Sequence, residues 1–179
     1  IRRYIMLDLS ELEAGWWEAM NRISNIYLLV VTTSFSVYYL PRLSEITEPN
    51  EVRREIGKAF KVIIPLLLTG FVLVYLCRFL IIRILFTSEF LPMAKLFGWQ
   101  MGSDLFKIGC YILTYVMIAK ARTVVYVTTE IVFTIIYIGL ACQLMQTSAG
   151  IIGVTQAGMA AYLLHMGVVY LYLRKIGYV

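Results

Sequence analysis

The stretch IVFTIIYIGLACQLMQTSAGIIGVTQAGMAAYLLHMGVVYLYL, residues 131–173, decides the fold because it contains no Asp, Glu, Lys or Arg. A helix rises about 1.5 Å per residue, and one crossing of the bilayer core needs about 20 apolar residues. The stretch is therefore too long for a single crossing. Its small and polar segment QTSAG, residues 146–150, predicts a turn between two membrane-spanning helices.

The composition of the whole chain agrees with this interpretation. Of its 179 residues, 60% are hydrophobic and 15% are charged. Soluble domains carry roughly 45–50% apolar and about 25% charged residues. Strand alternation is absent from the sequence, so we expect an all-α integral membrane protein. The net charge of +5 is interpreted through the position of the basic residues relative to the membrane, and no nucleic-acid partner is predicted.

Apolar runs predict five transmembrane helices, at about residues 15–40, 62–86, 96–119, 123–145 and 151–173. Pro41 is expected to end the first span, because proline lacks the N–H that a helix needs. Between the first two spans, residues 50–61 place Val52 and Ile56 on one face and Arg53 and Arg54 on another. This pattern predicts a short amphipathic helix at the membrane surface.

The basic residues outside the spans predict the orientation. One side would carry Arg42, Arg53, Arg54, Lys58, Lys61, Lys120, Arg122, Arg174 and Lys175, and the other only Arg2, Arg3 and Lys95. The richer side is expected to be cytoplasmic, together with the C-terminus. Five spans then put the other terminus outside, although the chain begins at Ile1 without a signal peptide. We therefore expect the C-terminal part of a longer protein, with residues 1–7 as the tail of a sixth span.

Polar residues within the spans identify the candidate site, since charge inside a bilayer is costly and needs a partner or a wet cavity. They recur at helical spacing in the first, third and fourth spans, which predicts a shared aqueous cavity. The candidates are Arg22, Asn25, Gln100, Asp104, Lys107, Tyr111 and Glu130.

Structural alternatives remain open for these residues. Asp104 and Lys107, three residues apart, could neutralise each other on one helix, and Glu18 could do the same for Arg22. Glu130 either pairs with Lys107 or Arg22 across the bundle or is protonated. The single histidine, His165, is either a proton relay or a hydrogen-bonded core residue.

Other sequence features are expected to serve architecture. Gly98 and Gly102, and a stripe of Gly153, Ala157 and Ala161, favour close helix packing. Trp99 is interpreted as an anchor at the membrane interface. The sequence predicts no metal site, no cofactor, no nucleotide-binding loop and no catalytic residues.

Three stretches, residues 14–46, 90–121 and 153–164, resemble the Wzx-type polysaccharide flippases of the MOP superfamily, which include the O-antigen and lipid III flippases. The most specific pieces are YLPRLS and the pattern W-Q-x-x-x-D-x-x-K. The resemblance implies a transporter of twelve helices in two lobes around a central cavity. This chain would be the C-terminal lobe, made of helices eight to twelve and the end of seven.

The same resemblance implies a function in the bacterial inner membrane. Such flippases move an undecaprenyl-diphosphate-linked oligosaccharide, such as an O-antigen unit or lipid III of enterobacterial common antigen synthesis, from the cytoplasmic to the periplasmic leaflet by alternating access. By position, the aspartate and lysine of the family's G-D-x-x-K stretch fall on Asp104 and Lys107, although Ser103 is inserted before Asp104 here. Family members often have aspartate at the position of Asn25.

The chemistry of that substrate implies roles for the candidate residues. Lys107 and Arg22 would bind the diphosphate, and the neighbouring polar groups Asp104, Asn25, Gln100 and Tyr111 would bind sugar hydroxyls or tune the lysine. Implied partners are the lipid-linked oligosaccharide, membrane lipids, the protein's own N-terminal lobe, a glycan polymerase and a chain-length regulator.

Two other functions are weighed against translocation. A cation-coupled small-molecule antiporter of the same superfamily would depend on carboxylates such as Glu130 and Asp104. A membrane-embedded glycan polymerase or ligase would need a large external loop, whereas the loop at residues 87–95 is short.

Overall fold

The computed structural model describes residues 1–147 and 149–179, and every regular element within these ranges is a helix. Five helical segments are long and apolar enough to cross a membrane, which confirms the predicted all-α class with five spans. Their bounds are Glu11–Glu45, Pro49–Leu85, Ser88–Ala119, Thr123–Met145 and Ile151–Lys175.

The first spanning segment follows a short helix, α1 (Arg2–Asp8), and consists of three parts. α2 (Glu11–Ser34) is capped by the preceding Ser10, whose Oγ accepts a hydrogen bond of 3.1 Å from the Glu13 backbone N–H. The wider π-helical turn η1 (Phe35–Tyr39) and α3 (Leu40–Glu45) then continue the segment.

The prediction that Pro41 ends this span is wrong, because the helical segment runs on to Glu45. Proline disturbs a helix by removing one N–H and by crowding the carbonyl one turn earlier. The π-helical turn of η1 directly precedes Pro41 and changes the backbone pairing of that turn. Pro41 itself lies in the first turn of α3, where its missing N–H costs little.

The expected surface helix at residues 50–61 is also different in the structure, where one continuous helix, α4 (Pro49–Leu85), contains both it and the second span. Its 37 residues correspond to about 55 Å at 1.5 Å per residue, which exceeds a hydrocarbon core of about 30 Å. Val52 and Ile56 are buried. The apolar face of residues 50–61 thus packs on the protein, and the helix continues from there into the span, past the internal Pro65.

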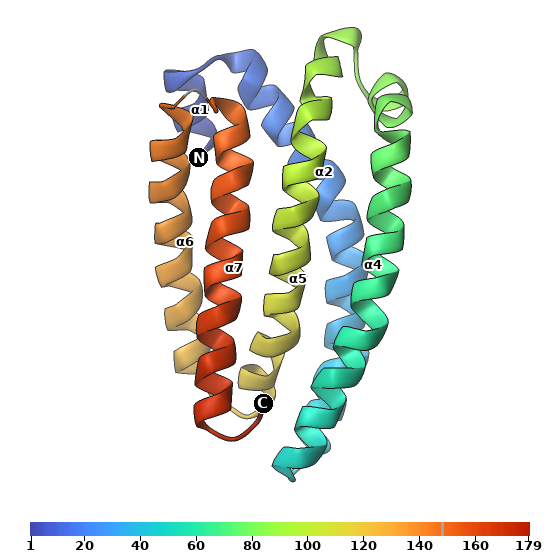
Figure 1. Cartoon of the computed structure of the whole chain (residues 1–179), viewed down its shortest axis with the longest axis vertical. Coiled ribbons are helices and arrows are strands. Elements are labelled where there is room, and N and C mark those ends of the chain that lie inside the picture. Colours follow the sequence, from blue (N-terminus) through green and yellow to red (C-terminus); the bar gives the residue numbers. More distant parts are fainter. Residues whose placement is uncertain (148) are drawn as a thin grey trace.

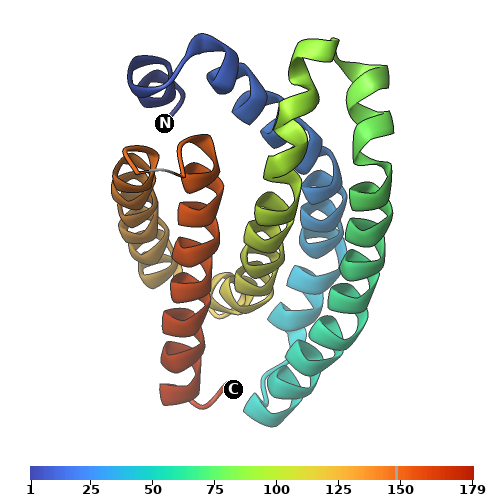
Figure 2. The same cartoon turned by 45° about the horizontal axis from the view of Figure 1, so that its top comes forward.

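The remaining helices form the centre and one side of the bundle. A 3-10 segment, η2 (Ser88–Leu96), leads into α5 (Phe97–Ala119), which lies centrally and has many buried residues. α6 (Thr123–Met145) and α7 (Ile151–Lys175) follow, and α7 packs extensively on both α5 and α6 (Figures 1 and 2). The turn predicted at residues 146–150 includes Ser148, which lies outside the described residues.

Small residues on α7 allow these close contacts. A Cβ at Gly153 would lie 2.7 Å from the Leu144 backbone on α6. A Cβ at Gly158 would lie 2.8 Å from Ser103 Oγ on α5. Ala157 and Ala161 are buried along the same helix. The packing role predicted for the small residues of this span is confirmed.

The two ends of the bundle differ in the segments that they bring together. The turn between α3 and α4, the turn between α5 and α6, and the C-terminus lie at one end, while the N-terminus and η2 lie at the other (Figure 1). Lys120 joins two of these turns, because its Nζ donates hydrogen bonds to the carbonyls of Leu43, at 2.8 Å, and Ile46. The segments that carry most of the basic residues outside the spans therefore meet at one end.

Candidate functional site

The centre of the candidate site is Asp104 on α5, which is 1% exposed. Its Oδ2 accepts hydrogen bonds from Ser24 Oγ, at 2.6 Å, and from the Tyr27 hydroxyl. Its Oδ1 accepts a bond of 3.2 Å from Gln100 Nε2. Ser24 and Tyr27 lie on α2. Neutral donors from two helices thus solvate this carboxylate, and they fix α2 against α5.

Lys107 lies one turn further along α5 and has different surroundings. Across residues 1–147 and 149–179 it forms no salt bridge, so the self-neutralising pair of Asp104 and Lys107 considered from the sequence does not form. Its Nζ lies 5.5 Å from the centre of the Tyr162 ring on α7, a cation–π distance. The ammonium group therefore keeps its charge available for an anion.

Asp104 and Lys107 line one cavity of about 260 Å³ between α2, α5, α6 and α7. Most of its other lining side chains carry hydrogen-bonding groups that suit hydroxyl-rich ligands. They include Trp17, Asn21, Gln100, Ser103, Tyr137, Thr155 and Tyr162.

Arg22 and Asn25 lie apart from this cavity, and both are exposed. Arg22 Nη2 lies 2.8 Å from Glu18 Oε1, so the pair expected within α2 does form. Arg2 joins it with its Nε 3.1 Å from Glu18 Oε2. These three charged groups line a separate pocket of about 280 Å³ with Phe86 and Phe90. The structure thus does not bring Arg22 together with Lys107.

Glu130 on α6 occupies a second, much smaller cavity of about 30 Å³ between α6 and α7. In the described part of the chain it forms a salt bridge with neither Lys107 nor Arg22. Its Oε1 is buried without a hydrogen-bond partner, and so is Nε2 of His165, which lines the same cavity. The His165 ring stacks on Phe133 with 4.4 Å between centroids. The cavities of Glu130 and Lys107 share Tyr137 and Tyr162 as walls.

Sequence reasoning missed several residues of the central site. Ser24 and Tyr27 are the direct partners of Asp104, and the spacing of three places both on one face of α2. Thr155 and Tyr162 come from α7, for which no polar stripe was predicted. Tyr111, by contrast, is half-buried and does not line this cavity. Among the described residues, no group of three His, Cys, Asp or Glu side chains is placed to hold a metal ion.

Comparison with known proteins finds two curated relatives. The chain is 34% identical over 166 residues to the lipid III flippase of Escherichia coli K12, and equally to that of Shigella flexneri. The match covers 92% of this chain but only 39% of each relative, so the chain spans well under half of their length. No family model matches the chain, and no solved structure matches it. The chain is thus a relative of transport proteins rather than of enzymes, and its resemblance to the Wzx-type flippases is confirmed.

Proposed function

We propose that this relative of the lipid III flippases serves as the C-terminal lobe of a transporter in the bacterial inner membrane. Its substrate would be an undecaprenyl-diphosphate-linked oligosaccharide, moved from the cytoplasmic to the periplasmic leaflet. The observation that carries the proposal is the Lys107 ammonium, which faces a polar cavity without a carboxylate partner among the described residues.

The electrostatics of the cavity support an anionic headgroup. A lysine held within apolar helices gains from an anion that replaces its lost hydration. Asp104 lies close by, but its two oxygens already accept three hydrogen bonds, which leaves it a weaker competitor for the ammonium. Lys107 would therefore bind the diphosphate, while Gln100 and Thr155 hydrogen-bond the first sugars.

The size of the cavity supports a second lobe. Ligand pockets commonly enclose about 300–1,000 Å³, whereas this cavity has about 260 Å³. It accommodates part of a headgroup, and the remaining walls would come from a facing lobe. Rocking of two lobes would then expose the headgroup to each side in turn.

Arg22 would contribute outside this cavity. With Arg2 it provides two positive charges against the single charge of Glu18, so their pocket is electropositive. In this proposal it contacts the anionic headgroup near the start of α2, before or after the headgroup occupies the cavity of Lys107.

Transport by the intact protein tests the proposal. Proteoliposomes are loaded with an undecaprenyl-diphosphate oligosaccharide, and its appearance in the outer leaflet is scored by an external glycosidase. Loss of a charge-assisted contact predicts that Lys107→Ala slows transport by about tenfold to a hundredfold. Lys107→Arg should retain most of the rate, and the exposed Lys61→Ala serves as the control. Equal rates for wild type and a folded Lys107→Ala protein would contradict the proposal.

One observation favours a second candidate, the cation-coupled small-molecule antiporter. Glu130 has a buried carboxylate oxygen without a partner, which is suited to a proton or a small cation. In that case Glu130→Gln abolishes transport of a cationic substrate, whereas Lys107→Ala leaves it nearly unchanged. The opposite pattern supports the flippase.

A further inference from the structure

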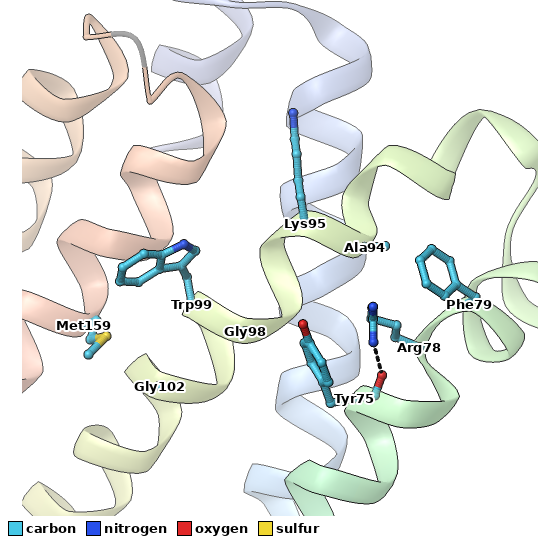
Figure 3. A pocket seen from close by; sticks show the side chains of 9 residues that line it. All are labelled: Tyr75, Arg78, Phe79, Ala94, Lys95, Gly98, Trp99, Gly102 and Met159. Atoms are coloured by element: carbon cyan, nitrogen blue, oxygen red, sulfur yellow. Dashed lines mark hydrogen bonds between the residues drawn. The ribbon is translucent and has the colours of Figure 1, made fainter.

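A separate pocket of about 640 Å³ lies between the second half of α4, η2, α5 and α7 (Figure 3). Its walls include Tyr75, Arg78, Phe79, Lys95, Trp99 and Met159. It shares no lining residue with the cavity of Lys107. An inference about this pocket therefore stands independently of the transport proposal.

Arg78 is held in place by its neighbours in α4. Its guanidinium carbon lies 4.1 Å from the centre of the Tyr75 ring and 4.6 Å from that of Phe79. Its Nη1 donates a hydrogen bond of 2.7 Å to the Tyr75 carbonyl, drawn in Figure 3. A guanidinium has five N–H donors, so most of them remain for a ligand. Arg78 forms no salt bridge within the two described ranges.

Lys95 also lines the pocket, but its side chain points away from Arg78 (Figure 3). Its Nζ lies 5.4 Å from the centre of the Trp16 ring, and among the described residues it has no salt-bridge partner either. No acidic side chain lines the described pocket. Arg78 is thus a cation at an apolar surface without a counter-charge among the described residues, and an anion bound to its guanidinium would supply one.

Two glycines of α5, Gly98 and Gly102, are among the residues that line the pocket. Gly98 and Gly102 were expected to bring helices together, and they differ in this respect. A Cβ at Gly98 would meet only the Tyr75 ring, at 3.8 Å. At Gly102 it would approach the flexible Met159 side chain, at 3.0 Å. Gly102 thus packs closely on α7, as predicted, whereas Gly98 leaves space for a ligand beside Trp99.

The surroundings of the pocket favour an amphiphilic ligand. Leu76 is 70% exposed and Leu80 is 58% exposed on the α4 surface around Arg78. In a protein with five candidate membrane spans, such an apolar surface faces lipid chains. A ligand here therefore needs an anionic group for Arg78 and apolar chains for the exposed leucines around it.

We propose that this pocket binds the phosphate of an anionic membrane lipid, with the Arg78 guanidinium as the phosphate ligand. Arginine binds phosphate through two parallel N–H bonds, and its aromatic stacking pre-organises that geometry. The Trp99 ring, 42% exposed at the same pocket, packs on the lipid backbone. The phosphate belongs either to a bulk phospholipid or to a polyprenyl diphosphate, and the experiment separates these two sources.

Binding of short-chain lipids to the intact protein in a non-ionic detergent tests the inference. Dihexanoyl phosphatidylglycerol is titrated while tryptophan fluorescence is recorded, and Trp99→Phe identifies the signal from the pocket. Arg78→Gln is expected to weaken binding by about tenfold. Lys95→Gln should weaken it less, because the Lys95 side chain points away from Arg78. Arg83→Gln is the matched control, because Arg83 is an exposed cation of the same helix outside the pocket.

Three further probes identify the ligand. Dihexanoyl phosphatidylcholine, which is zwitterionic, and inorganic phosphate should both bind more weakly. Farnesyl diphosphate binding more tightly than phosphatidylglycerol assigns the phosphate to a polyprenyl lipid, and weaker binding assigns it to a phospholipid. If Lys107→Ala binds phosphatidylglycerol as tightly as wild type does, the pocket is separate from the cavity of Lys107.

Several results would overturn the inference. These are equal affinities of wild type and Arg78→Gln for phosphatidylglycerol, equal affinities of wild type for the anionic and zwitterionic lipids, or binding of inorganic phosphate as tight as that of lipid. If Arg78→Gln does not fold, Gly98→Leu replaces it, because its side chain fills the pocket and leaves both cations in place. Unchanged lipid binding by Gly98→Leu would equally overturn the inference.

Discussion

Ser24 Oγ donates a hydrogen bond of 2.6 Å to Oδ2 of Asp104 and thereby joins α2 to α5 within the apolar bundle. The same carboxylate accepts from Tyr27 and Gln100, so three donors converge on one charge. Burying a carboxylate is costly unless hydrogen bonds replace its water. This arrangement makes Asp104 a structural link between helices, and it leaves Lys107 as the charged group of the cavity that is open to a ligand.

The link predicts that Asp104→Ala destabilises the protein. Removing the carboxylate leaves three donors without an acceptor, and a loss of about 3 kcal/mol in the free energy of unfolding is expected from such orphaned groups. Ser24→Ala should cost about 1 kcal/mol, since two donors remain. The purified variants are kept in a mild detergent and unfolded by titration with a denaturing detergent, which measures both changes in the free energy of unfolding.

Glu45→Ala is the control for that experiment, because Glu45 is an exposed acid at the end of α3. Combining Ser24→Ala with Asp104→Ala should cost little more than Asp104→Ala alone. Fully additive losses from the two substitutions would show that the bond contributes nothing.

The close approach of α6 and α7 predicts opposite effects of an alanine substitution at two glycines. Gly153→Ala would put a Cβ 2.7 Å from the Leu144 backbone, which cannot move like a flexible side chain. We expect a destabilisation of about 1–3 kcal/mol from this overpacking. Gly139→Ala on α6 meets nothing within 4 Å and should stabilise the protein by up to about 1 kcal/mol through helix propensity. Thermal unfolding of the two purified variants makes the comparison, and a tolerated Gly153→Ala would refute the tight contact.

The sequence predicts most of the fold because hydropathy alone determines which segments leave water. The span at Thr123–Met145 has the predicted bounds, and α5 begins within one residue of its prediction. The start of α4 was misjudged for a physical reason. Amphipathicity predicts that residues 50–61 cover an apolar surface, but it does not distinguish the lipid interface from the protein's own bundle.

The site was predicted only in part. A polar residue within a span indicates that the residue needs an interaction partner, but the sequence does not show which residue that partner is. Asp104, Lys107 and Gln100 do line one cavity. Arg22 satisfies its charge locally with Glu18 instead. Serine, threonine and tyrosine are common in membrane helices, so the donors Ser24 and Tyr27 carry no distinctive signal until the crossing of α2 and α5 is known.

Lys120 predicts how the turns at one end of the bundle are held together. Its ammonium group donates hydrogen bonds to the carbonyls of Leu43 and Ile46, which lie three residues apart where the first spanning segment ends. Lys120→Met keeps a long side chain but removes the donor, so that only water can hydrogen-bond both carbonyls. A loss of about 1–2 kcal/mol in the free energy of unfolding is therefore expected. Hydrogen exchange at residues 43–50 should also quicken. Arg122→Met, at an exposed position in the same turn, is the control. Equal hydrogen exchange in both variants would argue against the role of Lys120 in holding the turns together.

The unpartnered Oε1 of Glu130 predicts that a neutral substitute stabilises the folded protein. A carboxylate that loses water without gaining a partner raises the free energy of the folded state, and in the described part of the chain this oxygen has no hydrogen-bond partner. Glu130→Gln keeps the shape and removes the charge, so we expect the free energy of unfolding to rise by about 1 kcal/mol. Glu51→Gln, an exposed acid in the first turn of α4, should change it by less. Denaturation of the two variants in detergent measures these changes. A Glu130→Gln protein less stable than wild type would mean that the Glu130 carboxylate has a hydrogen-bonding partner in the folded protein.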